Sequence, residues 1–261
     1  MIERITELLR ACGNGQSHFP PTVFYCENWM VRLVADWIVR HPQNPILPVL
    51  DRARWYPEGL LASAFLPRYR GDQLAEGFTH ADAVIGHFTF GSTERGDVVL
   101  LPDVQQFSVI EAKMFSPLSA GTRRAPEFDQ AARNVACMAE LLRRARRRPS
   151  DLQSLNFTVM APRSRIEEGV FAVAMPKDSI RQKVTTRVAA YDGQRQEWLQ
   201  TWFLPALEVI HLGVVSWEDV LDAIHSAEPE YAASLRDYYC GCLKWNSLAV
   251  PPQTAATSLV S

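Results

Sequence analysis

Apolar residues recur along the chain with a helical period at first and then with the shorter period of strands. Residues 23–40 have apolar side chains at helical spacing, with Thr22 as the expected N-cap. Residues 1–16 predict a short amphipathic helix. Proline-rich residues 42–57 predict irregular structure, and residues 58–66 predict a further short helix.

Between residues 79 and 113, three short β-rich runs are separated by turn sequences, which predicts an antiparallel meander. The runs are ADAVIGHFTF, DVVLLP and FSVIEAKM. A loop follows, and Pro126 is expected at the first position of a helix with an apolar stripe from Phe128 to Leu142. Residues 156–161 then predict a buried strand. The first half therefore reads helix, three strands, helix, strand.

The second half is predicted to be mostly helical. Residues 169–176 are expected to form a strand, and residues 194–212 and 216–226 to form helices. Ser216 and Asp219 resemble a capping box at the start of the last of these helices.

These elements divide the chain into a core with its N-terminal helix (1–162), an α/β extension packed on it (163–246) and a flexible tail (247–261). The extension contains no motif that assigns its role. A specificity element, a dimer interface and a docking site for a partner protein all remain open for it.

The composition indicates a soluble globular protein. The 261 residues are 47% hydrophobic and 21% charged, with a formal net charge of -2, which excludes a disordered polyelectrolyte and a disulfide-rich miniprotein. No apolar run is long enough to cross a membrane, so no membrane partner is expected. Without an export signal, the five cysteines are expected to be reduced thiols of a cytoplasmic protein. Any anionic polymer must be bound by positive charge that is local.

Glu111 and Lys113 are the most distinctive pair in the sequence. Side chains alternate along a strand, so both point to the same face of the run Val109–Lys113. A strand this apolar is expected in the interior, where charged groups must be paired or bind a metal. The alternative is a solvent-accessible salt bridge on an edge strand.

Further polar residues precede and follow this strand. Asp82 and Asp97 each open an upstream strand, and Gln130 lies in the first turns of the following helix. Glu27 lies close to the apolar face of the first helix; its alternative role is a solvated first-turn residue stabilised by the helix dipole. For whichever aspartate is not in the site, a turn is the expected setting.

An acidic residue followed by Glu-x-Lys, in this order of elements, resembles the PD-(D/E)XK nuclease superfamily over residues 22–162. Glu27 resembles the acidic residue of the first core helix, Asp82 or Asp97 the motif aspartate, and Glu111-Ala112-Lys113 the (D/E)XK tripeptide. Asp97 has the commoner spacing and Asp82 the better local sequence, and Asp82 is preferred. Gln130 resembles the polar residue on the helix after the tripeptide.

The resemblance implies an α/β fold with a restriction-endonuclease-like core, namely a helix, a three-stranded antiparallel meander, a helix and a strand, followed by a mostly helical C-terminal extension. It also implies one or two Mg²⁺ (or Mn²⁺) ions held by Asp82 or Asp97, Glu111 and the carbonyl of Ala112.

The same resemblance implies the roles of the other residues. Lys113 would orient the attacking water or balance charge, and Gln130 would orient the nucleophile or a phosphate oxygen. Glu27 would reach the metal through a water.

Arginines follow the motif strand and are candidates for phosphate contacts. Arg123 and Arg124 lie in the loop, and Arg133 lies one turn beyond Gln130. The arginines within 143–148 could extend this track. Their alternative role, which is preferred, is that of a cationic helix C-terminus in solvent.

The leading hypothesis is a metal-dependent nuclease acting on DNA, in restriction, phage defence, mobile-element processing or repair. The alternative is a catalytically inactive relative that binds nucleic acid or protein, since a fold does not prove a function. A third is a cytoplasmic α/β scaffold in which Glu111 and Lys113 form a structural pair. Dimerisation through the C-terminal region is a further hypothesis.

Overall fold

A five-stranded mixed sheet forms the centre of the protein, with strand order β1-β2-β5-β6-β7. In this computed structural model, residues 2–14, 16, 19–92, 94–122 and 125–247 are described. The strands are β1 (Arg54–Leu61), β2 (Thr79–Gly86), β5 (Gln106–Ala112), β6 (Ser154–Ala161) and β7 (His211–Ser216). β1, β2 and β5 are antiparallel, whereas β5, β6 and β7 are parallel. The protein is therefore of the α/β class, as the sequence predicts.

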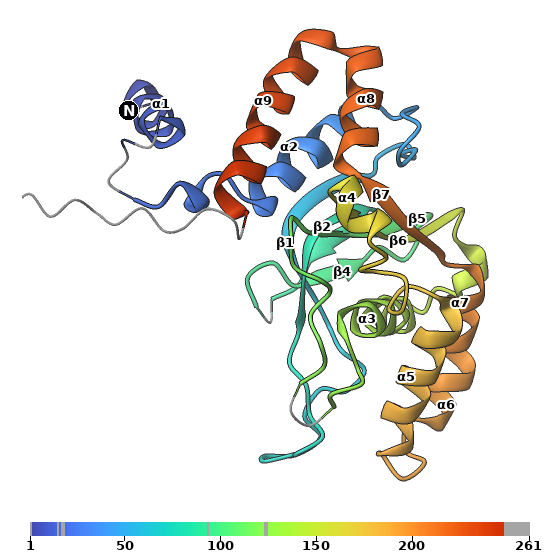
Figure 1. The fold of residues 1–261 in the computed structure, drawn as a ribbon. Coiled ribbons are helices and arrows are strands. Elements are labelled where there is room, and N and C mark those ends of the chain that lie inside the picture. Colours follow the sequence, from blue (N-terminus) through green and yellow to red (C-terminus); the bar gives the residue numbers. More distant parts are fainter. Residues whose placement is uncertain (1, 15, 17–18, 93, 123–124, 248–261) are drawn as a thin grey trace, which may run out of the picture.

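Helices cover both faces of this sheet (Figure 1). On one face lie α2 (Glu27–Arg40), α8 (Trp217–Ala227) and α9 (Pro229–Asn246). On the other lie α3 (Gln130–Arg144), α5 (Lys177–Ala189), α6 (Gln196–Trp198) and α7 (Leu204–Val209), the last two joined by a π-helical turn at Leu199–Phe203. The shorter elements are α4 (Arg163–Glu167) and the 3₁₀ turns Pro21–Val23 and Pro149–Asp151. The helix α1 (Ile2–Gly13) stands apart from the sheet.

Two apolar cores result, one on each face of the sheet. Alternating side chains of β5 divide between them: Phe107 and Val109 join the core around α3, and Ile110 and Ala112 join the core around α2. By the same alternation, Glu111 lies on the α3 side. The position of α3 therefore decides which groups Glu111 meets.

The prediction for residues 42–66 is confirmed for residues 42–53, which form turns and irregular structure, and is wrong from residue 54 onward. Residues 54–61 form β1 instead of irregular structure followed by a helix. Pro57 and Gly59 favour neither a helix nor a strand strongly. β1 is an edge strand of the sheet, however, and there a proline, which has no N–H, is tolerated. Pairing with β2 on both sides of Asp82 fixes the conformation.

The predicted meander of residues 79–113 needs correction. Residues 97–102 contribute β4 (Val98–Leu100), which pairs with β3 (Phe88–Phe90) in a separate two-stranded sheet. The three-stranded antiparallel unit exists, but its strands are β1, β2 and β5. β3 and β4 form a hairpin inserted between β2 and β5.

Several boundaries also differ from the prediction. The N-cap of α2 is Cys26 instead of Thr22, because Pro21–Val23 form a separate 3₁₀ turn. Pro126 does not open α3, which Asp129 caps by accepting a hydrogen bond from the Ala132 amide (3.0 Å). An ion pair of 2.7 Å between Lys183 of α5 and Asp129 holds this end of α3.

In the C-terminal half, residues 169–176 form turns instead of a strand, and the end of the predicted helix 194–212 is the start of β7. The N-cap half of the predicted capping box is confirmed, because Ser216 Oγ accepts a hydrogen bond from the Asp219 amide at 2.9 Å; the Asp219 carboxylate accepts from the Ser216 hydroxyl (2.6 Å). Since β7 pairs with β6, region 163–246 supplies a strand of the main sheet in addition to the helices that pack on it. Of the predicted tail, residues 248–261 lie outside the described residues.

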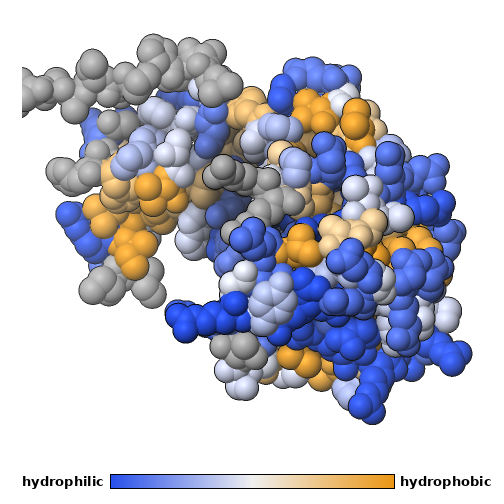
Figure 2. All heavy atoms as spheres, turned by 90° about the horizontal axis from the view of Figure 1, so that it is seen from below, coloured by the Kyte–Doolittle hydropathy of each residue, from blue (hydrophilic) through white to orange (hydrophobic). Residues whose placement is uncertain are grey.

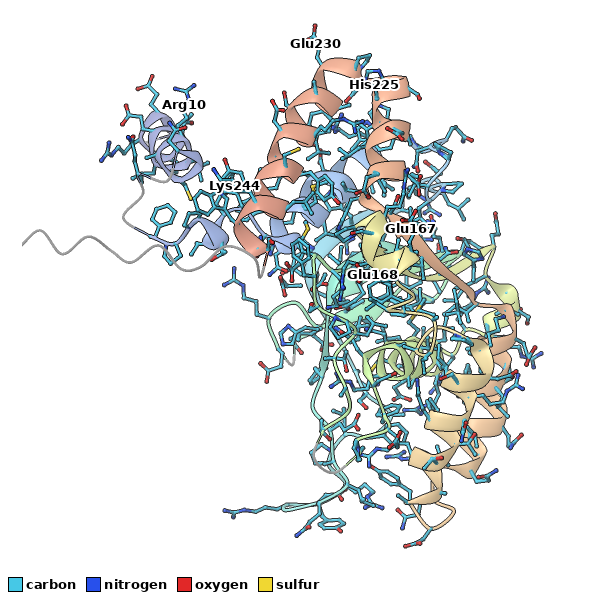
Figure 3. The ribbon with its side chains drawn as sticks, in the orientation of Figure 1. Arg10, Glu167, Glu168, His225, Glu230 and Lys244 are labelled. Carbon is cyan, nitrogen blue, oxygen red and sulfur yellow. The ribbon has the colours of Figure 1, made fainter. Side chains whose placement is uncertain are left out.

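Polar side chains cover most of the surface in Figure 2. Apolar patches lie between them, among others on the N-terminal part of the molecule. Ile5, Val23 and Trp29 are among the exposed large apolar residues. Charged side chains project from the outer helices, as Arg10, Glu230 and Lys244 illustrate (Figure 3). In the described part of the chain, no helix is long and apolar enough to cross a membrane.

Gly86 ends β2 at a point where the backbone leaves no room for a side chain. Its φ is 150°, and a Cβ there would lie 2.2 Å from the carbonyl oxygen of Gln106 in β5. We expect Gly86→Ala to lower the free energy of unfolding by about 2 kcal/mol or more. Urea unfolding measures this, with Gly77→Ala as control, since no atom lies within 4 Å of a Cβ at Gly77. Equal losses in both variants would contradict the prediction.

Candidate active site

Strands β2 and β5 separate at the place where the sequence motif begins. Their pairing runs from Gly86–Phe107 to Ala83–Ile110 and then stops, while β5 continues beside β6 to Ala112. The side chain of Asp82 occupies the gap, and its Oδ2 accepts a hydrogen bond of 2.8 Å from the Ala112 amide. A carboxylate thus replaces the main-chain partner that β2 no longer supplies.

The backbone after this point is held from the opposite side. The Lys113 amide donates to the Met160 carbonyl of β6 (2.8 Å), and the Lys113 carbonyl accepts from the Trp217 indole of α8 (2.9 Å). Since the N–H and C=O of one strand residue point the same way, the Ala112 carbonyl faces the gap beside Asp82. The gap therefore contains a carboxylate and, by this geometry, a main-chain oxygen.

Glu111 is the buried acid of the site, with 1% of its surface exposed. Its Oε1 accepts a hydrogen bond from Lys113 Nζ at 2.7 Å and another from the side-chain amide of Gln130. Its Oε2 lies 3.4 Å from Nδ2 of Asn134. The pairing of Glu111 with Lys113, expected from their common face, is present.

Burial and then the nearby charge of Asp82 raise the pKa of Glu111, Lys113 lowers it, and the net result is a pKa of about 8. Desolvation disfavours a charged carboxylate, and a second carboxylate close by adds repulsion. The two acids are therefore close enough to interact, which makes this location suitable for a cation.

α3 places Gln130 and Asn134 one turn apart on the side that faces β5. Gln130 Oε1 accepts from the Ser119 amide at 3.0 Å, so the amide of Gln130 is held between the loop and Glu111. Arg133 Nη2 donates to Ser119 Oγ at 3.0 Å. The sequence interpretation missed Asn134. Its i+4 spacing from Gln130 was the available signal, because residues four apart share a helix face.

Asp97 lies elsewhere. It is buried next to β4, its backbone bridges Leu60 of β1, and its carboxylate lies against Gly91. Among the described residues, no hydrogen bond or ion pair joins Asp97 to Glu111. The structure thus brings Asp82 to Glu111 and leaves Asp97 in the hairpin.

Glu27 begins α2, on the face of the sheet opposite to Glu111. Its charge acts on Cys242 of α9, whose thiol pKa is raised by burial first and then by Cys26 and Glu27. In the described part of the chain, no hydrogen bond or ion pair links Glu27 to Asp82, Glu111 or Lys113. A role for Glu27 at the site has no support from these contacts.

The arginines divide into three groups. Arg123 and Arg124 lie outside the described residues, and Arg133 borders the site through Ser119. Arg143 and Arg144 both pair with the buried Glu140, at 2.7 and 2.9 Å. These two arginines are committed to a carboxylate within α3, so they do not offer a free phosphate-binding track.

The residues fit a hydrated divalent ion but not one enclosed by protein ligands. Where the chain is described, no group of three or more His, Cys, Asp and Glu side chains could hold a metal. Mg²⁺ needs only one or two carboxylates, because it keeps several waters. Asp82, Glu111 and the Ala112 carbonyl meet that requirement if Glu111 Oε1 binds the metal ion and Lys113 at the same time.

Comparisons with protein-family models, curated proteins and solved structures find no match for this chain.

Proposed function

We propose that the protein is a metal-dependent nuclease that hydrolyses phosphodiester bonds of DNA, with the restriction-endonuclease-like core of the PD-(D/E)XK superfamily. The observation that carries the proposal is the gap between β2 and β5, where Asp82 binds the Ala112 amide beside the Glu111–Lys113 pair. The order α2, β1, β2, β5, α3, β6 supports it, because it is the order the resemblance implies.

Each residue would have a distinct task. Asp82, Glu111 and the Ala112 carbonyl would hold Mg²⁺ or Mn²⁺, which when bound stabilises charge on the scissile phosphate and lowers the pKa of water. Lys113, which is fixed by Glu111 at 2.7 Å, would hold the attacking water or the phosphate oxygen.

Gln130 would act as a positioning residue. Its amide touches Glu111, and its carbonyl is fixed by the Ser119 amide. Arg133, which donates to Ser119, would contribute positive charge beside the phosphate. Such local charge is what a chain with a net charge of -2 needs in order to bind DNA.

A catalytically inactive nucleic-acid- or protein-binding module is the second candidate, and one observation favours it. Glu111 already accepts hydrogen bonds from Lys113, Gln130 and Asn134, so its oxygens have partners without a metal. In this alternative the buried cluster is structural, and no cleavage occurs.

Cleavage of linear and supercoiled DNA in Mg²⁺, Mn²⁺ or EDTA tests the proposal and also separates the two aspartates. We expect the wild type to cut only with a metal, and Asp82→Asn to lower the rate by about 100-fold or more, because it removes a charged metal ligand. Asp97→Asn is the matched control and should cut at nearly the wild-type rate. Metal-dependent cutting that survives in Asp82→Asn and is lost in Asp97→Asn would contradict the assignment, and no cutting by the wild type would favour the inactive module.

A further inference from the structure

Strand β1 turns over at one position beside the candidate site. Tyr56 packs against the core around α3, and a Cβ placed at Gly59 would meet Val84 of the same core at 3.2 Å. Residues three apart on a regular strand face opposite sides of the sheet. The face that β1 presents to α3 therefore changes between Tyr56 and Gly59.

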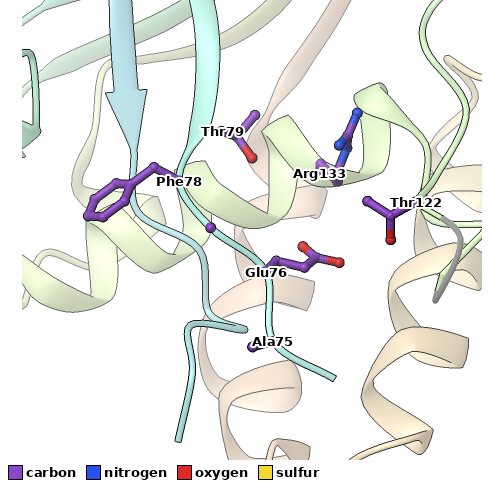
Figure 4. A pocket seen from close by; sticks show the side chains of 7 residues that line it. Ala75, Glu76, Phe78, Thr79, Thr122 and Arg133 are labelled. Carbon is purple, nitrogen blue, oxygen red and sulfur yellow. The ribbon is translucent and has the colours of Figure 1, made fainter. Parts of the chain in front are cut away.

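Strand β2 turns over at the same level. Ala81 and Val84 both belong to the core around α3, although they too are three residues apart, whereas Ala83 belongs to the core around α2. Thr79 also faces α3, because its Oγ1 accepts a hydrogen bond of 3.5 Å from the Cys137 thiol of that helix. Figure 4 shows Thr79 on this side of the sheet, where it lines a pocket next to α3. The two strands therefore reverse as a pair.

The reversal is centred on Glu58 and Asp82, which lie opposite each other. The residues that flank them are paired across the two strands, namely Pro57 with Ala83 and Gly59 with Ala81. Glu58 has a φ of 51°, in the left-handed region that residues with a side chain rarely adopt. The other described non-glycine residues with positive φ lie in turns; they are Arg52, Arg146 and Asp192. Glu58 is thus a departure from strand geometry inside β1.

This departure explains where the Asp82 side chain points. On a regular strand that side chain would enter one of the two cores. Its Oδ2 instead accepts from the Ala112 amide of β5 at 2.8 Å, and strand amides point along the plane of the sheet. The pairing of β2 with β5 also ends here, at Ala83 and Ile110. Rotation of β2 therefore both ends the ladder and directs the carboxylate into the gap.

Neighbouring elements hold the left-handed residue in place. The Leu60 amide, two residues further on, donates to the Gly96 carbonyl beside the β3–β4 hairpin at 2.9 Å. The Glu58 carboxylate pairs with Arg32 of α2 at 3.3 Å, but 40% of the Glu58 side chain is exposed, and so open an ion pair contributes little. Strained backbone conformations persist only where the surroundings enforce them, and they cluster at functional sites.

We propose that Glu58 is a positioning residue for Asp82. Its left-handed backbone turns β1 and β2 over and so aims the Asp82 carboxylate at the Ala112 amide and the metal site. The inference rests on the proposed nuclease function for the role of Asp82 as a metal ligand. Glycine adopts a positive φ freely, whereas a β-branched residue such as valine is strongly disfavoured there. Glu58→Gly and Glu58→Val therefore separate the effect of the backbone from that of the side chain.

Amide hydrogen exchange at Ala112 in EDTA tests the positioning without requiring cleavage. We expect Glu58→Val to speed this exchange by about tenfold or more, as Asp82→Ala should, because a hydrogen bond to a charged acceptor is lost. Glu58→Gly should keep the wild-type protection. The Lys113 amide, which donates to β6, should stay protected in every variant and reports an intact fold. Asp192→Val, which changes a left-handed residue in a turn after α5, is the matched control and should exchange like the wild type at Ala112.

Mg²⁺ binding, measured by calorimetry, connects the position of Asp82 to the proposed metal site. Glu58→Val should weaken the binding by about tenfold, because one of the few carboxylate ligands is misplaced, and Glu58→Gly should not. Equal Mg²⁺ affinity in Glu58→Val and the wild type would overturn the link to the metal site.

Unchanged protection of Ala112 in Glu58→Val would overturn the proposal. So would loss of protection in Glu58→Gly as well, which would assign the effect to the ion pair with Arg32. If Glu58→Val does not fold, Glu58→Ala takes its place, because alanine also disfavours this φ. The expected exchange pattern in a protein that neither binds Mg²⁺ nor cuts DNA would reject the nuclease function and leave the positioning of Asp82. Metal-dependent cleavage with unchanged protection in Glu58→Val would do the opposite.

Discussion

Lys113→Met is expected to lower the single-turnover rate of DNA cleavage by about 10³-fold, the range for loss of a charged group that stabilises a transition state. Methionine keeps the length of the stem and removes the ammonium group that lies 2.7 Å from Glu111 Oε1. Rates are measured with saturating enzyme in Mg²⁺, so that chemistry is separated from DNA binding. Lys244→Met, which changes a lysine on α9, is the matched control.

The pH profile of Lys113→Met reports the electrostatic effect of Lys113 on Glu111. Lys113 is the group that opposes the raised pKa of Glu111. Without it that pKa rises further, so the residual activity should require a higher pH than wild-type activity. A variant whose cleavage rate is within threefold of the wild-type rate, with the same pH profile, would show that Lys113 takes no part in the reaction.

Glu111→Gln is expected to stabilise the metal-free protein at high pH. The pKa of Glu111 is about 8 in the folded protein, against 4.5 for the unperturbed group. Between these values the folded state binds more protons than the unfolded state, so wild-type stability falls as pH rises from about 4.5 to 8. Removing the titrating group should flatten this part of the curve and raise the free energy of unfolding at pH 9 by roughly 2 kcal/mol.

Asn134 makes this substitution tolerable. Its Oδ1 is buried without a hydrogen-bond partner, and its Nδ2 is 3.4 Å from Glu111 Oε2. Rotation of that amide by half a turn would place an acceptor opposite the new glutamine NH₂, or opposite a protonated Glu111.

Urea unfolding in EDTA from pH 5 to 9 measures the effect. Glu140→Gln is the control, because it changes another buried glutamate and breaks the ion pairs to Arg143 and Arg144. It should destabilise the protein where Glu111→Gln stabilises it. Addition of Mg²⁺ at pH 9 should stabilise the wild type and leave Glu111→Gln nearly unchanged. Parallel pH curves for Glu111→Gln and the wild type would show that Glu111 does not titrate in this range.

Local patterns predicted the parts of the site that lie within one element. Glu111 and Lys113 share a face because strands alternate, and Gln130 faces them because α3 follows the same strand. The sequence could not decide between Asp82 and Asp97. That choice depends on which strand pairs with β5. Asp97 lies in the β3–β4 hairpin, away from Glu111, and the placement of this hairpin is a long-range feature.

The missed strands have a similar cause. β1 contains Pro57 and Gly59, which weaken a strand signal, and only its pairing with β2 makes the segment extended. β7 continues a helical pattern that ends at Val209, and its partner β6 lies about fifty residues earlier. Helices with a clear apolar stripe, such as α2 and α3, were predicted within a few residues of their boundaries.

The contact between α2 and α9 implies a particular order of events during synthesis. Asn246 donates to the Tyr25 carbonyl across 221 residues of sequence, and the Trp217 indole that fixes Lys113 also comes late in the chain. The apolar face of α2 has no complete cover on the ribosome until α9 has emerged, and this favours chaperone contact with the nascent chain. β5 would acquire its final support at the same late stage, so a partly made chain would lack the contact that holds the Lys113 backbone.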